Sequence, residues 1–270
     1  MAAPETASAL APEVRKSCCA DAYSGEWARL LLGDAFHPGG AALTERLGRV
    51  LGLAPGVRVL DVAAGKGTSA LFLARTFGCA VVGVDYADAS VCEATASAEV
   101  AGLAHLVRFE QGDAERLDFP DGAFDAAICE CAFCTFPDKR AAAQELARVL
   151  RPGGVLGLSD LTRAGAVPAE LQGLLAWIAC IADALPLAEY VRILADAGLT
   201  ITLTEPHGEA LRQLVRDVRL KLMGAELLVR LKQIELPGDF EQARALARAA
   251  ARAIDAGTFG YALLAASKPA

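Results

Sequence analysis

The stretch that decides the fold is residues 57–68, which read V-R-V-L-D-V-A-A-G-K-G-T. Its first half is a run of valine and leucine interrupted by Asp61, and such runs are typical of strands that are buried on both faces of a sheet. Gly65 and Gly67 follow directly, before a helix that we predict over 67–77. Glycine lets the backbone pass close to a ligand, and the start of a helix offers unpaired N–H groups. The stretch therefore predicts a strand, a ligand-binding turn and a helix.

The alternation of apolar strands and helices continues on the C-terminal side of this stretch. We predict further strands at 80–84, 106–111, 124–128, 155–159, 199–204 and 261–266, and helices at 88–100, 139–150, 168–182, 186–197, 208–235 and 239–255. Strands that alternate with helices of this length indicate a parallel sheet with right-handed crossovers. The sequence therefore predicts an α/β fold, with a doubly wound and mostly parallel sheet of seven strands.

The N-terminal part is expected to add helices to this domain. An Ala- and Pro-rich start predicts a disordered tail over 1–16, and helices are predicted at 20–32 and 41–51. We expect residues 17–56 to form a helical lid, and residues 57–270 to form one domain with a helical insertion at about 207–256. Apolar stripes on the insertion predict a cap or the face of a homodimer.

Composition excludes several classes of function. The chain has 270 residues and a net charge of −7, which is a poor match to nucleic acid. No apolar run approaches the roughly 20 residues that span a bilayer, so no membrane partner is expected. The start does not resemble a secretion signal, so we expect a cytoplasmic protein whose eight cysteines are thiols.

Three kinds of nucleotide site compete for the glycine turn. A phosphate-binding P-loop needs Ser or Thr after Gly-Lys, but Lys66 is followed by Gly67. A dinucleotide site needs a third glycine three positions after Gly67, and none is there. What remains is the acidic Asp61 before a short glycine turn, which suits a nucleoside that carries a cationic amino acid. The alternative is that Asp61 only caps the next helix.

The chain here resembles class I methyltransferases, whose first motif places an acidic residue and a G-x-G turn after strand one. The resemblance continues with V-V-G-V-D-Y at 81–86, G-D-A at 112–114 and L-R-P-G-G at 150–154. It implies the class I methyltransferase fold and S-adenosyl-L-methionine as cofactor, with an acidic residue on the ribose and residues after strand three facing the adenine. The cofactor-binding residues that it implies are Asp61, Ala63 (where the family usually has glycine), Gly65, Gly67, Thr68, Asp85, Tyr86, Asp113 and Ala114.

Cysteines near the predicted fourth strand suggest the methyl acceptor. Cys131 precedes Pro137-Asp138-Lys139, and Cys180 leads the segment C-I-A-D-A-L. At both places the chain resembles arsenite methyltransferases, and the resemblance implies that Cys131 and Cys180 bind trivalent arsenic as thiolates. Assisting thiols would come from Cys18, Cys19, Cys129 and Cys134.

Other interpretations of these residues stay open. The cysteines can simply pack in the core, and Cys129, Cys131 and Cys134 can hold zinc, although a fourth ligand is not evident. An organic acceptor would need a base, for which His37 is the best candidate because its usual pKa is near neutral. A cofactor-binding protein without turnover is a further alternative.

Overall fold

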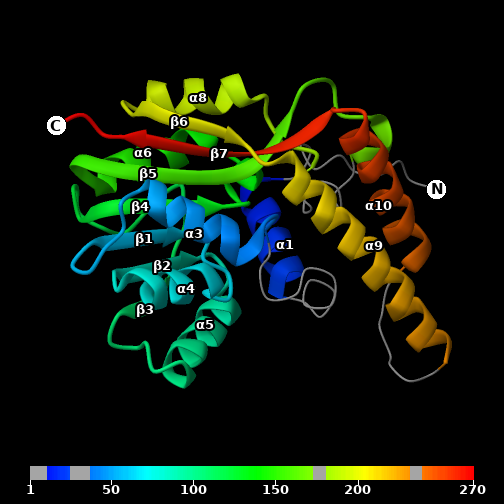
Figure 1. Ribbon diagram of the computed structural model, residues 1–270, viewed down its shortest axis with the longest axis horizontal. Coiled ribbons are helices and arrows are strands. Elements are labelled where there is room, and N and C mark those ends of the chain that lie inside the picture. Colours follow the sequence, from blue (N-terminus) through cyan, green and yellow to red (C-terminus); the bar gives the residue numbers. More distant parts are fainter. Residues whose placement is uncertain (1–10, 25–36, 173–180, 232–238) are drawn as a thin grey trace.

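A seven-stranded sheet organises the computed structural model, which describes residues 11–24, 37–172, 181–231 and 239–270 (Figure 1). The strand order is β3-β2-β1-β4-β5-β7-β6. Strands β1 to β5 pair in parallel, and β7 runs antiparallel to both β5 and β6. The bounds are β1 Arg58–Val62, β2 Ala80–Asp85, β3 Val107–Gln111, β4 Phe124–Glu130, β5 Leu150–Arg163, β6 Thr200–Pro206 and β7 Phe259–Ser267. The doubly wound, mostly parallel sheet is thus confirmed.

Helices cover both faces of this sheet, which explains why its central strands are apolar throughout. In Figure 1, α3 and α4 lie in front of the sheet and α6 lies behind it. Three successive residues of β1, Val59 to Asp61, are almost fully buried, as are residues 126–129 of β4. The helices are α1 Pro12–Ser24, α3 Gly40–Val50, α4 Thr68–Phe77, α5 Asp88–Val100, α6 Lys139–Val149, α8 Leu187–Asp196, α9 Gly208–Arg230 and α10 Phe240–Asp255, with short 3-10 turns at Phe133–Thr135 and Ala169–Leu171.

The turn between β1 and α4 requires glycine for two separate reasons. Gly67 has a φ of +76°, a conformation that residues with a Cβ adopt at a cost. A Cβ at Gly67 would also lie 2.3 Å from Cζ of Phe109, which comes from β3. The close approach of this turn to β3 brings the start of α4 to the carboxyl edge of the sheet.

Most predicted elements are confirmed to within one or two residues, and the predicted helix at 88–100 coincides with α5. The predicted disordered tail over 1–16 is wrong in its last part, because α1 begins at Pro12. Proline is well suited to the first turn of a helix, and Glu13 places an acid there as well. Residues 20–24 of the predicted helix at 20–32 belong to α1, and its residues 25–32 lie outside the described residues. So do residues 173–180 of the predicted helix at 168–182, which otherwise contains the short turn Ala169–Leu171.

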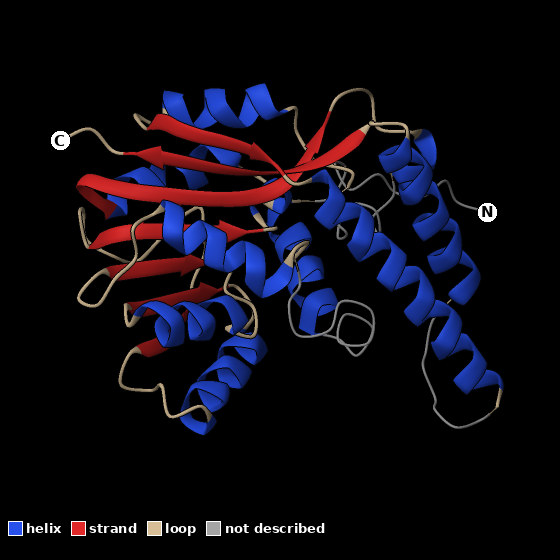
Figure 2. Cartoon of the chain, in the orientation of Figure 1, coloured by secondary structure: helices blue, strands red, loops and turns tan. Residues whose placement is uncertain are grey.

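The predicted insertion between β6 and β7 consists of α9 and α10. These two helices run side by side and project away from the sheet (Figure 2). An ion pair between Glu226 of α9 and Arg244 of α10 joins them. Among the described residues, no helix has the length and apolar character that a membrane crossing needs.

Candidate active site

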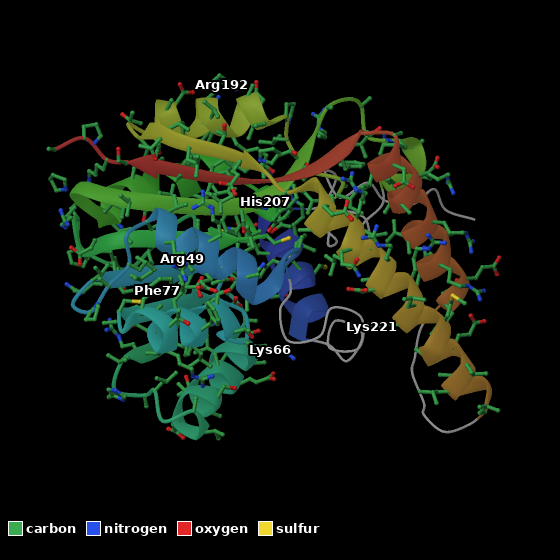
Figure 3. The ribbon with its side chains drawn as sticks, in the orientation of Figure 1. Arg49, Lys66, Phe77, Arg192, His207 and Lys221 are labelled. Carbon is green, nitrogen blue, oxygen red and sulfur yellow. The ribbon has the colours of Figure 1, made fainter. Side chains whose placement is uncertain are left out.

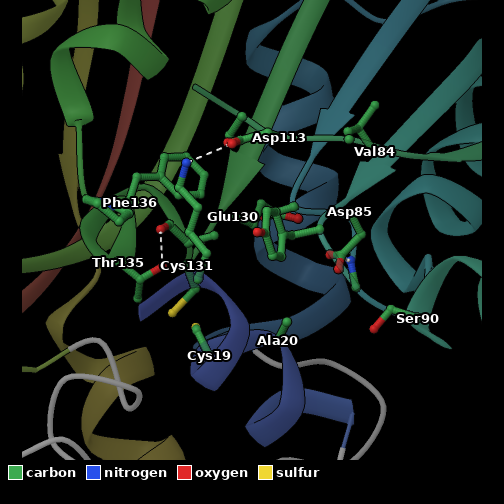
Figure 4. A pocket seen from close by; sticks show the side chains of 18 residues that line it. Cys19, Ala20, Val84, Asp85, Ser90, Asp113, Glu130, Cys131, Thr135 and Phe136 are labelled. Atoms are coloured by element: carbon green, nitrogen blue, oxygen red, sulfur yellow. Dashed lines mark hydrogen bonds and ion pairs between the residues drawn. The ribbon is translucent and has the colours of Figure 1, made fainter. Parts of the chain in front are cut away.

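A pocket lies at the carboxyl ends of the parallel strands, where doubly wound folds bind their ligands (Figure 4). The wall contains Gly65 from the turn after β1, Asp85 from β2, Asp113 from the loop after β3, and Glu130 from β4. Helix α1 faces these strand ends from the other side. Five parts of the chain that are distant in sequence therefore meet at one site.

Asp85 ends β2 and holds the glycine turn in place. One of its carboxylate oxygens, Oδ2, accepts a hydrogen bond of 2.8 Å from the N–H of Gly65, and Oδ1 accepts one of 2.9 Å from the N–H of Ala87. Burial raises the pKa of Asp85, against the effect of these backbone hydrogen bonds. Each carboxylate oxygen can accept more than one hydrogen bond, so Asp85 can also receive hydroxyl groups of a ligand.

Lys16 fixes α1 over the pocket. Its Nζ lies 2.7 Å from Oδ2 of Asp113 and 2.5 Å from Oε2 of Glu115, and its side chain is only 15% exposed. Burial lowers the pKa of Lys16, but the hydrogen bonds to the two acids outweigh burial and raise that pKa. Sequence reasoning missed Lys16 because it placed residues 1–16 in a tail, and the partners of Lys16 lie about a hundred residues away in sequence.

Glu130 ends β4 and is the second functional residue that sequence reasoning missed. Its Oε2 accepts hydrogen bonds from the hydroxyls of Ser69 (2.6 Å) and Thr44 (2.9 Å), and its Oε1 accepts one of 3.3 Å from Ser159. The side chain is 4% exposed, yet it forms part of the pocket wall. The available signal was an acid at the end of a predicted buried strand, the same signal that identified Asp61 and Asp85.

Asp61 lies behind this wall and strengthens its negative charge. The residue is 2% exposed, and its Oδ2 has no hydrogen-bond partner among the described residues. Burial, followed by the negative charges of Glu130 and Asp85, raises the pKa of Asp61 well above its usual value. Three acids near the ends of neighbouring strands, with Asp61 and Glu130 buried and Asp85 half-buried, repel one another when ionised, so a ligand with positive charge is favoured here.

Two thiols face each other beside these carboxylates. Cys19 of α1 and Cys131, directly after β4, both line the pocket, and Figure 4 shows their sulfur atoms pointing toward one another. Cys131 has a φ of +55°, which is uncommon for a residue with a Cβ, and its N–H donates a hydrogen bond of 2.6 Å to the carbonyl of Ser159. Strain of this kind concentrates at functional sites.

Of the other predicted substrate thiols, the three that the structure describes, Cys18, Cys129 and Cys134, do not line the pocket. Cys129 is fully buried in the core, and burial together with the nearby Asp160 and Asp61 raises the pKa of its thiol well above the usual value. Cys134 is also fully buried, because the turn Phe133–Thr135 directs it into the core, and Cys18 lies on α1 outside the pocket wall. Cys180 lies outside the described residues. Within the described ranges, no three His, Cys, Asp or Glu side chains gather in a way that could hold a metal ion.

His37 reaches the pocket only through Glu130. The ring is 7% exposed, and its Nε2 lies 3.3 Å from Oγ1 of Thr44 and 3.6 Å from Oε2 of Glu130. Its Nδ1 donates to the carbonyl of Pro38. His37 is therefore placed to support Glu130, whereas the predicted role as a base in contact with the acceptor remains a prediction.

The predicted cofactor residues divide into two groups. Those that line the pocket are Ala63, Gly65, Asp85, Tyr86, Asp113 and Ala114. Asp61, Gly67 and Thr68 lie behind the wall, in β1 and at the start of α4.

Comparison with known proteins connects this site to methyl transfer. Residues 59–154 match the family described as "Methyltransferase domain". The sterol 24-C-methyltransferase of Yarrowia lipolytica is 36% identical over 137 residues, which are 51% of this chain and 36% of that protein. The chain thus aligns with little more than a third of that relative's length. Methyltransferase GfsG of Streptomyces halstedii is 28% identical over 257 residues, which cover 92% of this chain and 87% of that protein.

Solved structures share the fold over nearly the whole chain. The putative sarcosine dimethylglycine methyltransferase of Galdieria sulphuraria superposes with a TM-score of 0.80 at 22% identity, and the match covers 92% of this chain and 99% of that one. The [4+2]-cyclase SpnF superposes with a TM-score of 0.74 at 25% identity, covering 92% and 94%.

Proposed function

We propose that this protein is an S-adenosyl-L-methionine-dependent methyltransferase. The observation that carries the proposal is a group of three acids near the carboxyl ends of β1, β2 and β4: the side chains of Asp61 and Glu130 are buried, and Asp85 is half-buried. S-adenosyl-L-methionine carries a sulfonium and an ammonium group, and these positive charges would offset the repulsion among the three acids. The match of residues 59–154 to a methyltransferase domain supports the same activity.

The residues present fit this cofactor. The Asp61 oxygen without a partner among the described residues is a feature of a site built around a ligand, and the acids Asp85 and Asp113 line the pocket together with Gly65 of the glycine turn. Asp85 would accept the ribose hydroxyls, and Asp113 and Ala114 would face the adenine, as the family resemblance implies. When bound, the cofactor supplies an electrophilic methyl group. Helix α1 would exclude water from that group, which favours transfer to the intended acceptor.

Cofactor binding is tested by calorimetric titration of the purified chain with S-adenosyl-L-methionine. Asp85→Asn should weaken binding by about tenfold or more, because a hydrogen-bonded charged acceptor is lost from a buried site. Asp125→Asn is a matched control, since Asp125 lies at the opposite end of β4 and pairs with Arg151. Failure of the unmodified chain to bind S-adenosyl-L-methionine would refute the proposed function.

For the acceptor, we propose trivalent arsenic or a similar thiophilic metalloid held by Cys19 and Cys131. The facing thiols at the pocket support this proposal, as does the resemblance of the Cys131 segment to arsenite methyltransferases. Soft thiolate ligands select soft metals and metalloids over hard cations. The pair differs from the expected Cys131 and Cys180, because α1 brings Cys19 to Cys131.

The two thiolates would bind arsenic and leave its lone pair directed at the cofactor. The arsenic lone pair forms the new bond to the methyl carbon, while the electrons of the broken C–S bond stay on the cofactor sulfur. Arsenic is formally oxidised from +3 to +5 in this step. A thiol reductant such as glutathione must therefore return it to +3 before another methyl group is added.

The test is transfer of a labelled methyl group from S-adenosyl-L-methionine to arsenite, with glutathione present. We expect methylated arsenic from the unmodified chain and a loss of at least about a hundredfold in Cys19→Ser and Cys131→Ser, because each removes one of two ligands. Cys92→Ser is the matched control, since Cys92 is exposed on α5, away from the pocket. Full activity of both pocket variants would show that Cys19 and Cys131 do not bind the acceptor. Cofactor binding without methylated arsenic would point to an organic acceptor, and cofactor binding without product from any acceptor would indicate a protein that binds the cofactor without turnover.

A second candidate acceptor is an organic small molecule, which the named relatives favour. Most residues of the pocket wall are apolar or small, which suits such a molecule. The group that faces the acceptor would then be Glu130, with His37 behind it. In this case Cys19→Ser and Cys131→Ser should keep their activity on the organic acceptor, whereas Glu130→Gln should lose it.

A further inference from the structure

Glu130 is a buried acid to which the proposed transfer to arsenic assigns no role. Its three hydroxyl partners come from α3, α4 and β5, so three separate elements hold one carboxylate. All three hydroxyls donate to it, and donated hydrogen bonds stabilise negative charge on an acceptor. Ser159 in turn accepts a hydrogen bond of 3.1 Å from the hydroxyl of Tyr261. The fold therefore fixes the position of this carboxylate rather than leaving it to solvent.

Few positive charges of the protein neutralise Glu130. Among the residues that the structure describes, the basic side chain within ion-pair distance of it is His37, at 3.6 Å. Lys16, which also lines the pocket, forms ion pairs with Asp113 and Glu115. Burying a carboxylate without a full counter-ion is costly, and a cationic ligand can offset that cost.

The order of residues along the pocket places Glu130 at the reactive end of the cofactor. The adenosine part would lie against Asp85 and Asp113, at the ends of β2 and β3. The methyl group must point at the acceptor, which the proposed function places at Cys19 and Cys131. Glu130, which forms the pocket wall between these two regions directly before Cys131, would therefore face the sulfur atom of the bound cofactor.

We propose that Glu130 recognises the sulfonium charge and makes the pocket bind S-adenosyl-L-methionine more tightly than the product S-adenosylhomocysteine. This inference rests on the proposed function. Transfer of the methyl group removes one positive charge, because the sulfonium becomes a neutral thioether. The product then loses its attraction to Glu130 and leaves, while S-adenosyl-L-methionine replaces it. Glu130 is thus a residue that determines the specificity for the charged cofactor.

The experiment measures the dissociation constants of both ligands by calorimetry, for the full chain and for variants. The unmodified chain should bind S-adenosyl-L-methionine about tenfold more tightly than S-adenosylhomocysteine, as expected for one ion pair partly screened by the site. In Glu130→Gln this ratio should fall to about one, with the affinity for S-adenosylhomocysteine nearly unchanged. Glu130→Asp should keep part of the ratio, because the charge remains.

Asp85→Asn is the matched control for a residue that contacts a part common to both ligands. This variant should weaken the binding of both ligands equally, so the ratio of their dissociation constants should stay the same. A general loss of folding would also weaken both ligands, so a change of the ratio in Glu130→Gln is specific to the lost charge. An unchanged ratio in Glu130→Gln overturns the inference but leaves the proposed function intact. Equal affinities in the unmodified chain overturn it even if Glu130→Gln does not fold. Binding of neither ligand overturns both.

Discussion

At the scale of single residues, acidic side chains at the strand ends determine the character of the site. Asp61 and Asp85 were identifiable from the sequence because a strand-end acid beside glycine is a local pattern. Glu130 also ends a strand, but its neighbours are cysteines and no glycine lies beside it, so the local pattern is weaker. Lys16 and the Cys19–Cys131 pair are different, since they depend on contacts across about a hundred residues. No local pattern encodes such contacts, so the structure was needed to find them.

The raised pKa of Asp61 makes cofactor affinity depend on pH. In the free protein, burial and the charges of Glu130 and Asp85 raise the pKa of Asp61 well above its usual value of 3.8. Asp61 therefore keeps its proton to a higher pH. Positive charge in the pocket favours the ionised form, so binding S-adenosyl-L-methionine releases a proton. Affinity should therefore rise as pH rises from 3.8 through the raised pKa, and level off above it.

Calorimetric titrations at several pH values, each in two buffers of different ionisation enthalpy, measure this affinity and the released proton together. Asp61→Asn is the control, because it cannot ionise and should bind with less dependence on pH. An affinity that falls over the same pH range would contradict the prediction.

Ala63 carries backbone strain that a substitution can remove. It has a φ of +60°, at the position where class I methyltransferases usually have glycine. Relief of about 1–2 kcal/mol of left-handed strain exceeds the entropic cost of glycine, so Ala63→Gly should raise the free energy of unfolding by up to about 1 kcal/mol. Denaturant unfolding measures the change. Ala64→Gly, at a residue without a positive φ, should instead lower the stability.

At the scale of elements, apolar periodicity was sufficient to predict the sheet and most helices. The central strands are buried on both faces and the helices on one, so their patterns differ and most of their bounds follow from the sequence, although β5, predicted at 155–159, spans Leu150–Arg163. Helix α1 was predicted to begin later than it does, because its sequence, P-E-V-R-K-S-C-C-A, has little apolar periodicity. It is held instead by ion pairs, and Arg15 also approaches Asp183, at 3.9 Å.

The ion pairs of Lys16 should control how fast the cofactor leaves. Because α1 covers the pocket and Lys16 anchors it to Asp113 and Glu115, a bound ligand leaves when these contacts open. Lys16→Met keeps the apolar stem but removes the charge, and it should speed dissociation of S-adenosyl-L-methionine by about three- to tenfold, as partly exposed ion pairs contribute up to about 1 kcal/mol. Stopped-flow fluorescence measures this rate.

Arg192→Met is the control for the loss of a surface cation. Arg192 pairs with Glu189 and Asp196 within α8, so its removal should leave the dissociation rate unchanged. A dissociation rate in Lys16→Met equal to that of the unmodified chain would mean that α1 does not limit release.

At the scale of the whole molecule, the pocket and the α9–α10 pair lie in different parts of the fold. The pocket is built from α1 and the ends of β1 to β4, whereas α9 and α10 follow β6 and project from the sheet (Figure 3). Several large apolar side chains on α9 are exposed, namely Leu220, Met223, Leu227 and Leu228. The apolar stripe expected on this helix is a different set of residues, of which Leu211 and Leu222 are buried, so the exposed apolar face was not predicted.

Cofactor binding should therefore stabilise the chain unevenly. At a concentration of about 100 times its dissociation constant, a ligand that binds only the folded state adds about 2.7 kcal/mol to the free energy of unfolding. For a chain of this size that corresponds to a rise in Tm of roughly 5–10 °C. Protection of backbone amides should increase in α1 and at the ends of β1 to β4, since these segments surround the pocket. The outer half of α9, which the pocket does not touch, should exchange as before.

Hydrogen exchange followed by mass spectrometry, with and without S-adenosyl-L-methionine, measures this pattern, and the melting curve gives the total. Asp85→Asn under the same conditions separates a bound ligand from a solvent effect, because weaker binding should reduce both the Tm shift and the added protection. Equal protection across α9 and the pocket segments would show that the molecule responds as one rigid unit. The separation of the α9–α10 pair from the site would then be wrong.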